Sequence, residues 1–292
     1  MNHLSIQKKV QIVNLLVEGN SMRSIMRILD VSKGAVAKLL VEVGRACMAF
    51  HNDTVINVKA SKIQADEIWA YVGCKDKNAT DEQKDSGMGD AWTWVGIDAD
   101  TKLVVSWFVG NRSAESATIF MQDMASRLSN RVQLTTDGHH AYLEGVTDAF
   151  GSYIDYAQLI KIYGSSSDSS SPTERKYSPS KLKSIEKHLV SGKPDKEHIS
   201  TSYVERQNLT MRMHMRRFTR LTNGFSKKLE NHMHAIALHF VYYNFVKQHN
   251  SLRITPAMAA GLTKRFMTLE DIVTMIPERK PNRPLSYKKK AA

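Results

Sequence analysis

The sequence predicts an α/β fold, in which a mixed five-stranded sheet with flanking helices is preceded by an all-α domain. Apolar residues recur at helical spacing over residues 1–45, and the period then changes to two. Strand-like and helix-like runs alternate as far as residue 163. The chain has 292 residues, of which 42% are hydrophobic, so it can form two or three domains with buried cores.

Three short helical segments are predicted at the start of the chain. The first has an apolar stripe and ends at Gly19. Ser21 and Ser32 are placed to cap the second and third segments, because a serine hydroxyl accepts a backbone N–H at a helix start. This spacing is typical of a helix-turn-helix, although a three-helix bundle with no DNA role has the same apolar pattern. A helix-turn-helix would present these residues of its third helix to a DNA major groove: Ser32, Lys33 and Lys38.

The sheet is predicted from five strand-like runs. The first covers residues 62–73, and the next two, 91–98 and 102–110, form a hairpin joined by a tight turn. A helix over 113–129 follows, and residues 131–164 hold a fourth strand, a short helix and a fifth strand. Asp98 and Asp100 flank the hairpin turn and are interpreted as turn residues.

The last 130 residues contain no further predicted strand. Residues 164–202 are rich in Ser, Pro and Lys, which predicts a flexible insertion with a short helix over 180–189. Two helices, over 203–221 and 223–250, and a smaller helical end follow. The predicted units are a helix-turn-helix domain (1–50), a linker (51–61), a catalytic domain that includes the insertion (62–250), and a basic helical extension with its tail (251–292).

Three carboxylates lie within or at the ends of the predicted strands and helices. Asp66 lies within the first strand, Asp137 ends the fourth, and Glu205 begins the helix after the fifth. The strand order places the first and fourth strands side by side in a mixed sheet, which is the ribonuclease-H-like arrangement. Asp137 could also be a turn residue and Glu205 could complement a helix dipole. An unpaired acid buried in a strand costs several kcal/mol, which favours a metal or basic partner for Asp66.

Such a set of acids suits phosphodiester chemistry. Two Mg²⁺ ions about 4 Å apart would be held by carboxylate oxygens, and Mn²⁺ is also possible. Asp66, Asp137 and Glu205 are therefore the predicted catalytic and metal-binding residues. His232 and His239 share one helical face, but no Cys or carboxylate completes a metal site there, and a partly buried helix explains the pattern.

The positive charge points to nucleic acid. The net charge is +12, and residues 201–292 hold 17 Lys and Arg against 5 Asp and Glu, whereas the first 200 residues are balanced. A basic solvated surface is the alternative. On the helix that begins near Glu205, the residues predicted to follow a DNA backbone are Asn208, Arg212, Arg216, Arg217 and Arg220. One of His139 and His140 is expected near the DNA, unless the pair caps the next helix.

Other partners and compartments are limited by what the sequence lacks. No stretch approaches 18 consecutive apolar residues and no signal peptide opens the chain, so no membrane partner is expected. Cys47 and Cys74 are the only cysteines, too few for a disulfide framework or a four-cysteine zinc site. A cytoplasmic, nucleoid-associated protein is predicted.

A family resemblance rests on four stretches: QADEIWAYVG, AWTWVGID, LTTDGHHAY and SYVERQNLTMRMHMRRFTRLTNGFSKKLENH. Over roughly residues 60–250 the chain resembles the DDE transposases of bacterial insertion sequences, of the insertion-sequence-one type. The resemblance implies that Asp66, Asp137 and Glu205 are the DDE acids, and that Arg212 matches a basic residue used near the transposon end. It also implies binding of terminal inverted repeats by the helix-turn-helix, DNA cleavage with strand transfer, and a homodimer or larger synaptic assembly. The cysteine-rich zinc module that begins many relatives has no counterpart here.

The sequence thus predicts a Mg²⁺-dependent DNA transposase that acts on double-stranded DNA, both terminal inverted repeats and target. Two alternatives stay open. One is a structure-selective DNA nuclease with the same fold, which would cleave without joining. The other is a catalytically silent DNA-binding regulator derived from a transposase.

Overall fold

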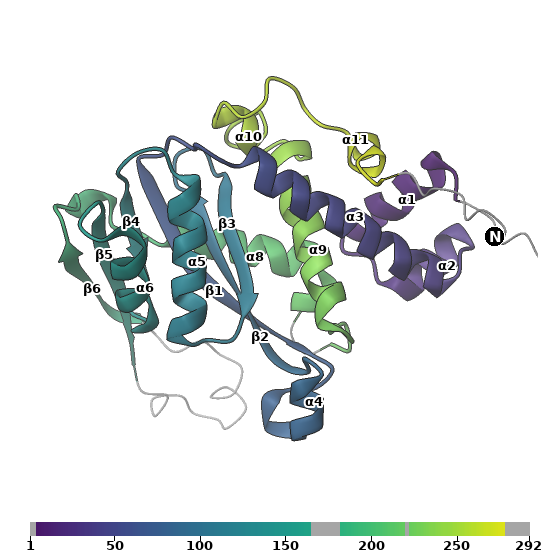
Figure 1. Cartoon of the computed structure of the whole chain (residues 1–292), viewed down its shortest axis with the longest axis horizontal. Coiled ribbons are helices and arrows are strands. Elements are labelled where there is room, and N and C mark those ends of the chain that lie inside the picture. The colour runs from purple at the N-terminus through teal and green to yellow at the C-terminus, as the bar shows by residue number, and fades with distance from the viewer. Residues whose placement is uncertain (1–3, 165–181, 220–221, 278–292) are drawn as a thin grey trace, which may run out of the picture.

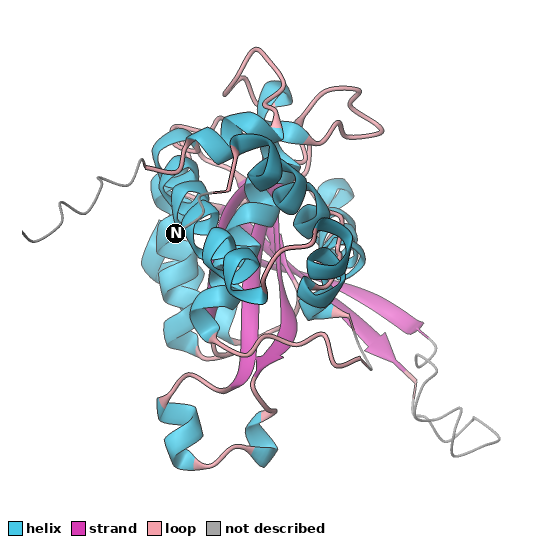
Figure 2. Ribbon diagram, turned by 90° about the vertical axis from the view of Figure 1, so that its right-hand side faces the viewer, coloured by secondary structure: helices cyan, strands magenta, loops and turns pink. Residues whose placement is uncertain are grey.

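One mixed six-stranded sheet with helices on both faces forms the body of the protein (Figure 1, Figure 2). The computed structural model describes residues 4–164, 182–219 and 222–277. The strand order is β3-β2-β1-β4-β5-β6, and this sheet with its flanking helices is compatible with a ribonuclease-H-like fold. The strands are β1 Lys62–Val72, β2 Gly89–Asp98, β3 Val104–Gly110, β4 Gln133–Thr136, β5 Asp155–Tyr163 and β6 Leu182–Ser191.

The predicted neighbours within the sheet are confirmed. β1 runs antiparallel to β2, and β2 and β3 form the expected hairpin. The Asp98 carboxylate accepts the Asp100 and Thr101 backbone N–H groups, so it does serve the hairpin turn. β1 pairs in parallel with β4, with Ala65 opposite Thr136. One step further along both strands, this register brings Asp66 level with Asp137.

Helices cover the two faces of the sheet separately. α5 (Ala114–Arg127) and α6 (Ala141–Phe150) lie on the face to which Trp94 points, and the Trp94 ring packs on Phe120 and Tyr142. α8 (Ser202–His214) and α9 (Leu229–Val241) lie on the other face, where Val95 is buried in one cluster with residues of both helices. Successive side chains of β2 therefore serve opposite layers, as strand geometry requires.

Three helices precede the sheet at the end of the molecule far from β6 (Figure 1). They are α1 Ile6–Val17, α2 Met22–Leu29 and α3 Lys33–Thr54. The two predicted serine caps are confirmed, because Ser21 Oγ accepts Ser24 N–H and Ser32 Oγ accepts Ala35 N–H, each at 3.1 Å. That these helices bind DNA as a helix-turn-helix stays a prediction.

The third helix is longer than predicted. It runs for 22 residues, past the expected end near Gly44, because it packs along α9. The approach at Gly44 is close: a Cβ there would lie 2.3 Å from the Cβ of His234. Residues 51–61 were predicted as a linker, but they begin with the last turn of α3, and Val55 and Val58 are buried in the core.

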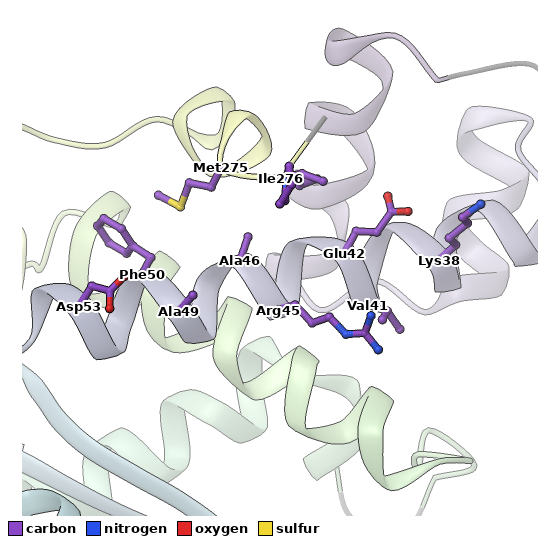
Figure 3. Close-up of a pocket in the computed structure, with 11 residues that line it drawn as sticks. Lys38, Val41, Glu42, Arg45, Ala46, Ala49, Phe50, Asp53, Met275 and Ile276 are labelled. Carbon is purple, nitrogen blue, oxygen red and sulfur yellow. The ribbon is translucent and has the colours of Figure 1, made fainter. Parts of the chain in front are cut away.

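The C-terminal helices return to the N-terminal ones. α10 (Pro256–Ala259) and α11 (Leu269–Thr274) follow a π-helical turn, Tyr242–Val246, that continues α9. α11 packs on α1 and α3, and a mostly apolar groove of about 920 Å³ lies between α3 and the end of α11 (Figure 3). Phe50 and Ala46 stand on the α3 side of this groove, opposite Met275 and Ile276.

The expected insertion contains a sixth strand, so the five-stranded prediction is wrong. β6 occupies most of the segment predicted as a helix over 180–189 and pairs antiparallel with β5. Leu182, Ile185 and Leu189 have helical spacing, but each stays about half exposed, so no helix layer buries them. Pairing with β5 instead satisfies the backbone. Of the rest of the predicted insertion, residues 192–202 are described and end at the first residue of α8. Residues 165–181 lie outside the described residues, as do residues 278–292 of the predicted extension and tail.

Short helical segments lie in the β1–β2 connection and before α8. The connection between β1 and β2, predicted as a loop, contains a 3₁₀ turn (Asp76–Asn78) and α4 (Asp81–Asp85), which has a capping box at Thr80. A second 3₁₀ turn, Lys196–His198, precedes α8. Within the described ranges, no helix is both long and apolar enough to cross a membrane.

The buried His239 gives the fold a testable acid sensitivity. Burial, with lesser effects from His214 and Lys247, lowers the pKa of His239 from 6.5 to about 3. The unfolded chain then takes up a proton below pH 6.5 that the folded chain refuses, so stability falls as the pH drops from 6.5 toward 3. His239→Leu keeps the volume roughly constant. We expect this variant to lose about 2 kcal/mol less unfolding free energy than the wild type between pH 7.5 and pH 5.

Urea denaturation at the two pH values measures this difference. Both ring nitrogens of His239 lack a hydrogen-bond partner among the described residues, so leucine removes no hydrogen bond seen there. Equal losses in the two proteins would contradict the assignment.

Candidate active site

Three carboxylates meet at the end of the β1–β4 pair. Asp66, Glu67 and Asp137 each offer an oxygen, and these oxygens lie within 4.8 Å of one another. No other group of three such side chains could hold a metal ion in the part of the chain that the structure describes. The oxygen-only donor set fits a hard divalent cation such as Mg²⁺ better than a softer one.

The Asp66 carboxylate is in electrostatic conflict with its surroundings. Its carboxylate accepts a 2.9 Å hydrogen bond from Asn208 Nδ2 on α8. Burial first, and then the charges of Glu67, Asp137 and Glu205, raise the pKa of Asp66 from 3.8 to about 7. No cationic side chain of the described residues pairs with it. A bound cation would relieve this conflict, which supports the sequence interpretation that Asp66 has a metal partner.

Glu67 was not singled out from the sequence. Its side chain is 1% exposed, and because it follows Asp66 in a strand it points to the opposite face of the sheet. There Oε1 accepts Arg112 Nε–H at 2.6 Å and forms an ion pair with Arg112 Nη2, also at 2.6 Å, and Oε2 accepts the Tyr142 hydroxyl at 2.9 Å. Both oxygens are already engaged, so Glu67 is less suited than Asp66 to bind a metal. Two consecutive acids within one apolar strand are the signal that could have revealed it.

Asp137 makes a turn contact, as a turn residue would, and its carboxylate also lies in the cluster of acids. Its Oδ1 accepts the His139 backbone N–H at 3.0 Å, which is a local turn interaction. Its Oδ2 lies 4.0 Å from Arg112 Nη2, and the side chain is 38% exposed. The turn thus anchors Asp137 while one of its oxygens lies within 4.8 Å of oxygens of Asp66 and Glu67.

Glu205 lies beside the cluster and not inside it. It stands in the first turn of α8, where its carboxylate pairs with Lys161 of β5 and accepts the Thr201 hydroxyl at 2.6 Å. Its charge still contributes to the raised pKa of Asp66. The structure therefore brings Glu205 close enough to affect the pKa of Asp66, while Lys161 holds its carboxylate.

The predicted DNA-contacting residues separate into buried and exposed groups. Asn208 is buried against Asp66, whereas Arg217 is half-buried and donates from Nη1 to Ser226 Oγ at 2.8 Å. This partial burial lowers the pKa of Arg217 to about 10. That these two side chains contact DNA stays a prediction. Ser32, Lys33 and Lys38 are exposed at the start of α3.

The helix that carries these residues also ends earlier than predicted. α8 stops at His214, and Arg216, though exposed, lies in a separate 3₁₀ turn, Arg216–Phe218. Arg216 therefore does not continue the face of Glu205. Arg212 is half-buried in the last turn of α8, and Arg220 lies outside the described residues.

The two histidines after Asp137 have different surroundings. His139 stacks on Trp94 with ring centroids 5.9 Å apart and meets Tyr142 edge-on. His140 is exposed at the position before α6 and makes no side-chain capping bond there. His139 thus fixes the turn after β4, and His140 is the one of the pair that solvent reaches.

Comparisons with known proteins give little further information. No protein-family model matches the chain, and no curated protein matches it. Among solved structures, it is similar to a chain in the crystal structure of the Mos1 strand transfer complex, with 10% sequence identity and a TM-score of 0.23. The similarity covers 96% of this chain and 81% of that one, but at this TM-score it supports no conclusion.

Replacement of Asp66 tests the electrostatic conflict directly. In the folded protein its pKa is about 7 and in the unfolded chain about 3.8, so the wild type loses stability as the pH rises from 4 to 7. Asp66→Asn removes this loss and can still accept the Asn208 bond. We expect the variant to exceed the wild type by about 1–3 kcal/mol in unfolding free energy at pH 8, and by nothing near pH 4.

Urea denaturation at both pH values, in the presence of EDTA, measures this difference. In the same buffer with Mg²⁺ or Mn²⁺ in place of EDTA, we expect the wild type to gain stability and the variant not to, because binding to the folded state raises its stability. A variant less stable than the wild type at pH 8 would contradict the prediction that the ionised Asp66 carboxylate destabilises the folded protein.

Proposed function

We propose that the protein is a DNA transposase of the insertion-sequence-one type, which binds terminal inverted repeats and catalyses metal-dependent cleavage and strand transfer. The observation that carries the proposal is the meeting of Asp66 and Asp137 at the end of adjacent parallel strands, with Glu205 beside them on α8. The family resemblance assigns these same three acids the DDE role. The concentration of positive charge in the last third of the chain supports a nucleic-acid substrate.

The proposed reaction has two steps on DNA. Water cleaves the phosphodiester at the element end, and the freed 3′-hydroxyl then attacks target DNA in line, without a covalent enzyme intermediate. Mg²⁺ bound by the acids would supply activation of the attacking oxygen and stabilisation of the leaving oxygen. Asp66 and Asp137 would hold the metal, and Glu205 would join them once its carboxylate turns from Lys161. Asn208 keeps Asp66 oriented through its hydrogen bond.

The chain offers two regions to the DNA. Lys33 and Lys38 are exposed on the first turns of α3, where a recognition helix would meet a major groove. A DNA end held there would have to extend to the carboxylate cluster of the same or a second copy. We propose a homodimer or larger synaptic assembly on this ground and on the resemblance.

Loss of the Asp137 carboxylate should separate chemistry from binding. We expect Asp137→Ala to abolish strand-transfer products from end-containing DNA in Mg²⁺, with less than about twofold change in DNA affinity, because metal ligands act on the reacting phosphate. Asp148→Ala, which removes an exposed acid of α6, is the matched control and should keep full activity.

Gel analysis of labelled DNA ends scores nicked and joined products separately. Nicking without joining by the wild type would favour the nuclease alternative, and no nicking would favour the silent regulator. Joined products from Asp137→Ala would refute the acid's role.

The N-terminal helices can be tested through salt dependence. Removal of a lysine that neutralises one DNA phosphate should reduce the slope of log K against log salt concentration by about 0.9. We expect the double variant Lys33→Ala, Lys38→Ala to bind repeat DNA more weakly, with a slope smaller by up to about 2. The control is Lys77→Ala, Lys84→Ala, which removes two exposed lysines from the β1–β2 connection.

Fluorescence anisotropy of a labelled repeat duplex at several salt concentrations gives both slopes. Equal slopes in the two double variants would remove the helix-turn-helix assignment while leaving the catalytic proposal intact.

A further inference from the structure

We propose that Arg112 is a substrate-binding residue that contacts a DNA phosphate beside the carboxylate cluster. The inference rests on the proposed function and concerns a residue that neither the acid pattern nor the basic C-terminal region includes. Arg112 lies between β3 and α5, on the face of the sheet opposite α8. Its guanidinium reaches the cluster from that side, 4.0 Å from Asp137 and 2.6 Å from Glu67.

The guanidinium is held in one orientation by two side chains from the sheet. Nε donates to the buried Glu67 and Nη2 forms an ion pair with the same oxygen, while the other oxygen of Glu67 accepts the Tyr142 hydroxyl. The plane of Arg112 also lies over the Trp92 ring, 4.8 Å from its centroid. A carboxylate and an aromatic ring together restrict a long side chain that would otherwise lose its freedom on binding.

The backbone on either side of Arg112 is fixed as well. The Asn111 carbonyl accepts the Trp94 indole N–H at 3.1 Å, and its side-chain oxygen accepts the Ser113 and Ser116 hydroxyls, both at 2.6 Å. This turn therefore positions Arg112 before any ligand arrives. Preorganised donors bind a charged ligand without a further ordering entropy cost.

The donors that remain point to a ligand. An arginine has five N–H groups, and here only Nε–H donates a hydrogen bond to Glu67, while Nη2 forms an ion pair with it. Nη1 has no hydrogen-bond partner among the described residues, and the side chain is 42% exposed. DNA that approaches three carboxylates meets repulsion, and the guanidinium is the cationic group placed against them from this face. Its fork geometry suits phosphate oxygens.

The competing explanation is structural: Arg112 could serve only to neutralise the buried Glu67. Arg112→Gln alone does not separate the two, because it leaves a buried acid without its cation and could unfold the protein. The double variant Arg112→Gln, Glu67→Gln restores charge balance in the buried pair. A structural role predicts that the double variant regains both stability and DNA binding. A phosphate contact predicts that it regains stability and not binding.

The experiment uses the full-length protein, a labelled duplex oligonucleotide and Ca²⁺, with anisotropy read at several salt concentrations. We expect the double variant to bind about fivefold to tenfold more weakly than the wild type at 0.1 M salt, with a slope of log K against log salt smaller by about 0.9. The matched control is Arg131→Gln, Asp155→Asn at the other end of β4, where an arginine with 36% exposure also pairs with a carboxylate. This control should keep the wild-type slope.

The outcomes separate this inference from the proposed function. An unchanged slope in the folded double variant overturns the Arg112 contact, while Mg²⁺-dependent joining by the wild type upholds the transposase. A reduced slope without any wild-type nicking upholds the contact and overturns the chemistry. Failure of the wild type to bind duplex DNA overturns both.

Discussion

Parallel pairing of β1 with β4 determines where the site can form, because it fixes the register of the two strands that carry the aspartates. With Ala65 opposite Thr136, the next residue of each strand is an acid. β4 contains only four residues, and Asp137 follows its last one, so the backbone is already turning where the carboxylates meet. A shift of one residue in this pairing would direct Asp66 to the opposite layer of the sheet. The buried apolar neighbours on both faces, Ala65 and Ile68 among them, oppose such a shift.

The resulting group of acids is costly to fold, and side chains from both layers offset the cost. On one face Arg112 and Tyr142 donate to Glu67, and on the other Asn208 donates to Asp66 while Lys161 pairs with Glu205. These donors come from the β3–α5 connection, α6, α8 and β5, which are far apart in the sequence. The fold thus stabilises the site through its surroundings, whereas the acids themselves repel.

The sequence predicts the features that depend on local patterns. Period-two runs predicted β1 to β5, serines predicted the starts of α2 and α3, and the strand order predicted that Asp66 and Asp137 would be close. Features that depend on tertiary contact were missed. β6 forms because the edge of β5 accepts a partner, although its apolar residues have helical spacing. α3 extends beyond Gly44 because it packs along α9. α8 ends at His214, although basic residues follow it in the sequence. Charge patterns alone did not distinguish the half-buried Arg217 from the exposed Arg216.

Glu67 shows why residue type does not decide which acid is available to a cation. It follows Asp66 directly, and both have carboxylate oxygens in the same small cluster. Strand alternation gives them different neighbours: Glu67 meets a guanidinium and a hydroxyl, and Asp66 meets an uncharged amide. Burial raises the pKa of both carboxylates, but Arg112 and Tyr142 lower that of Glu67, whereas no cationic side chain among the described residues pairs with Asp66, whose pKa rises to about 7. A divalent ion would therefore gain most at Asp66 and Asp137, while Glu67 keeps Arg112 in position beside them.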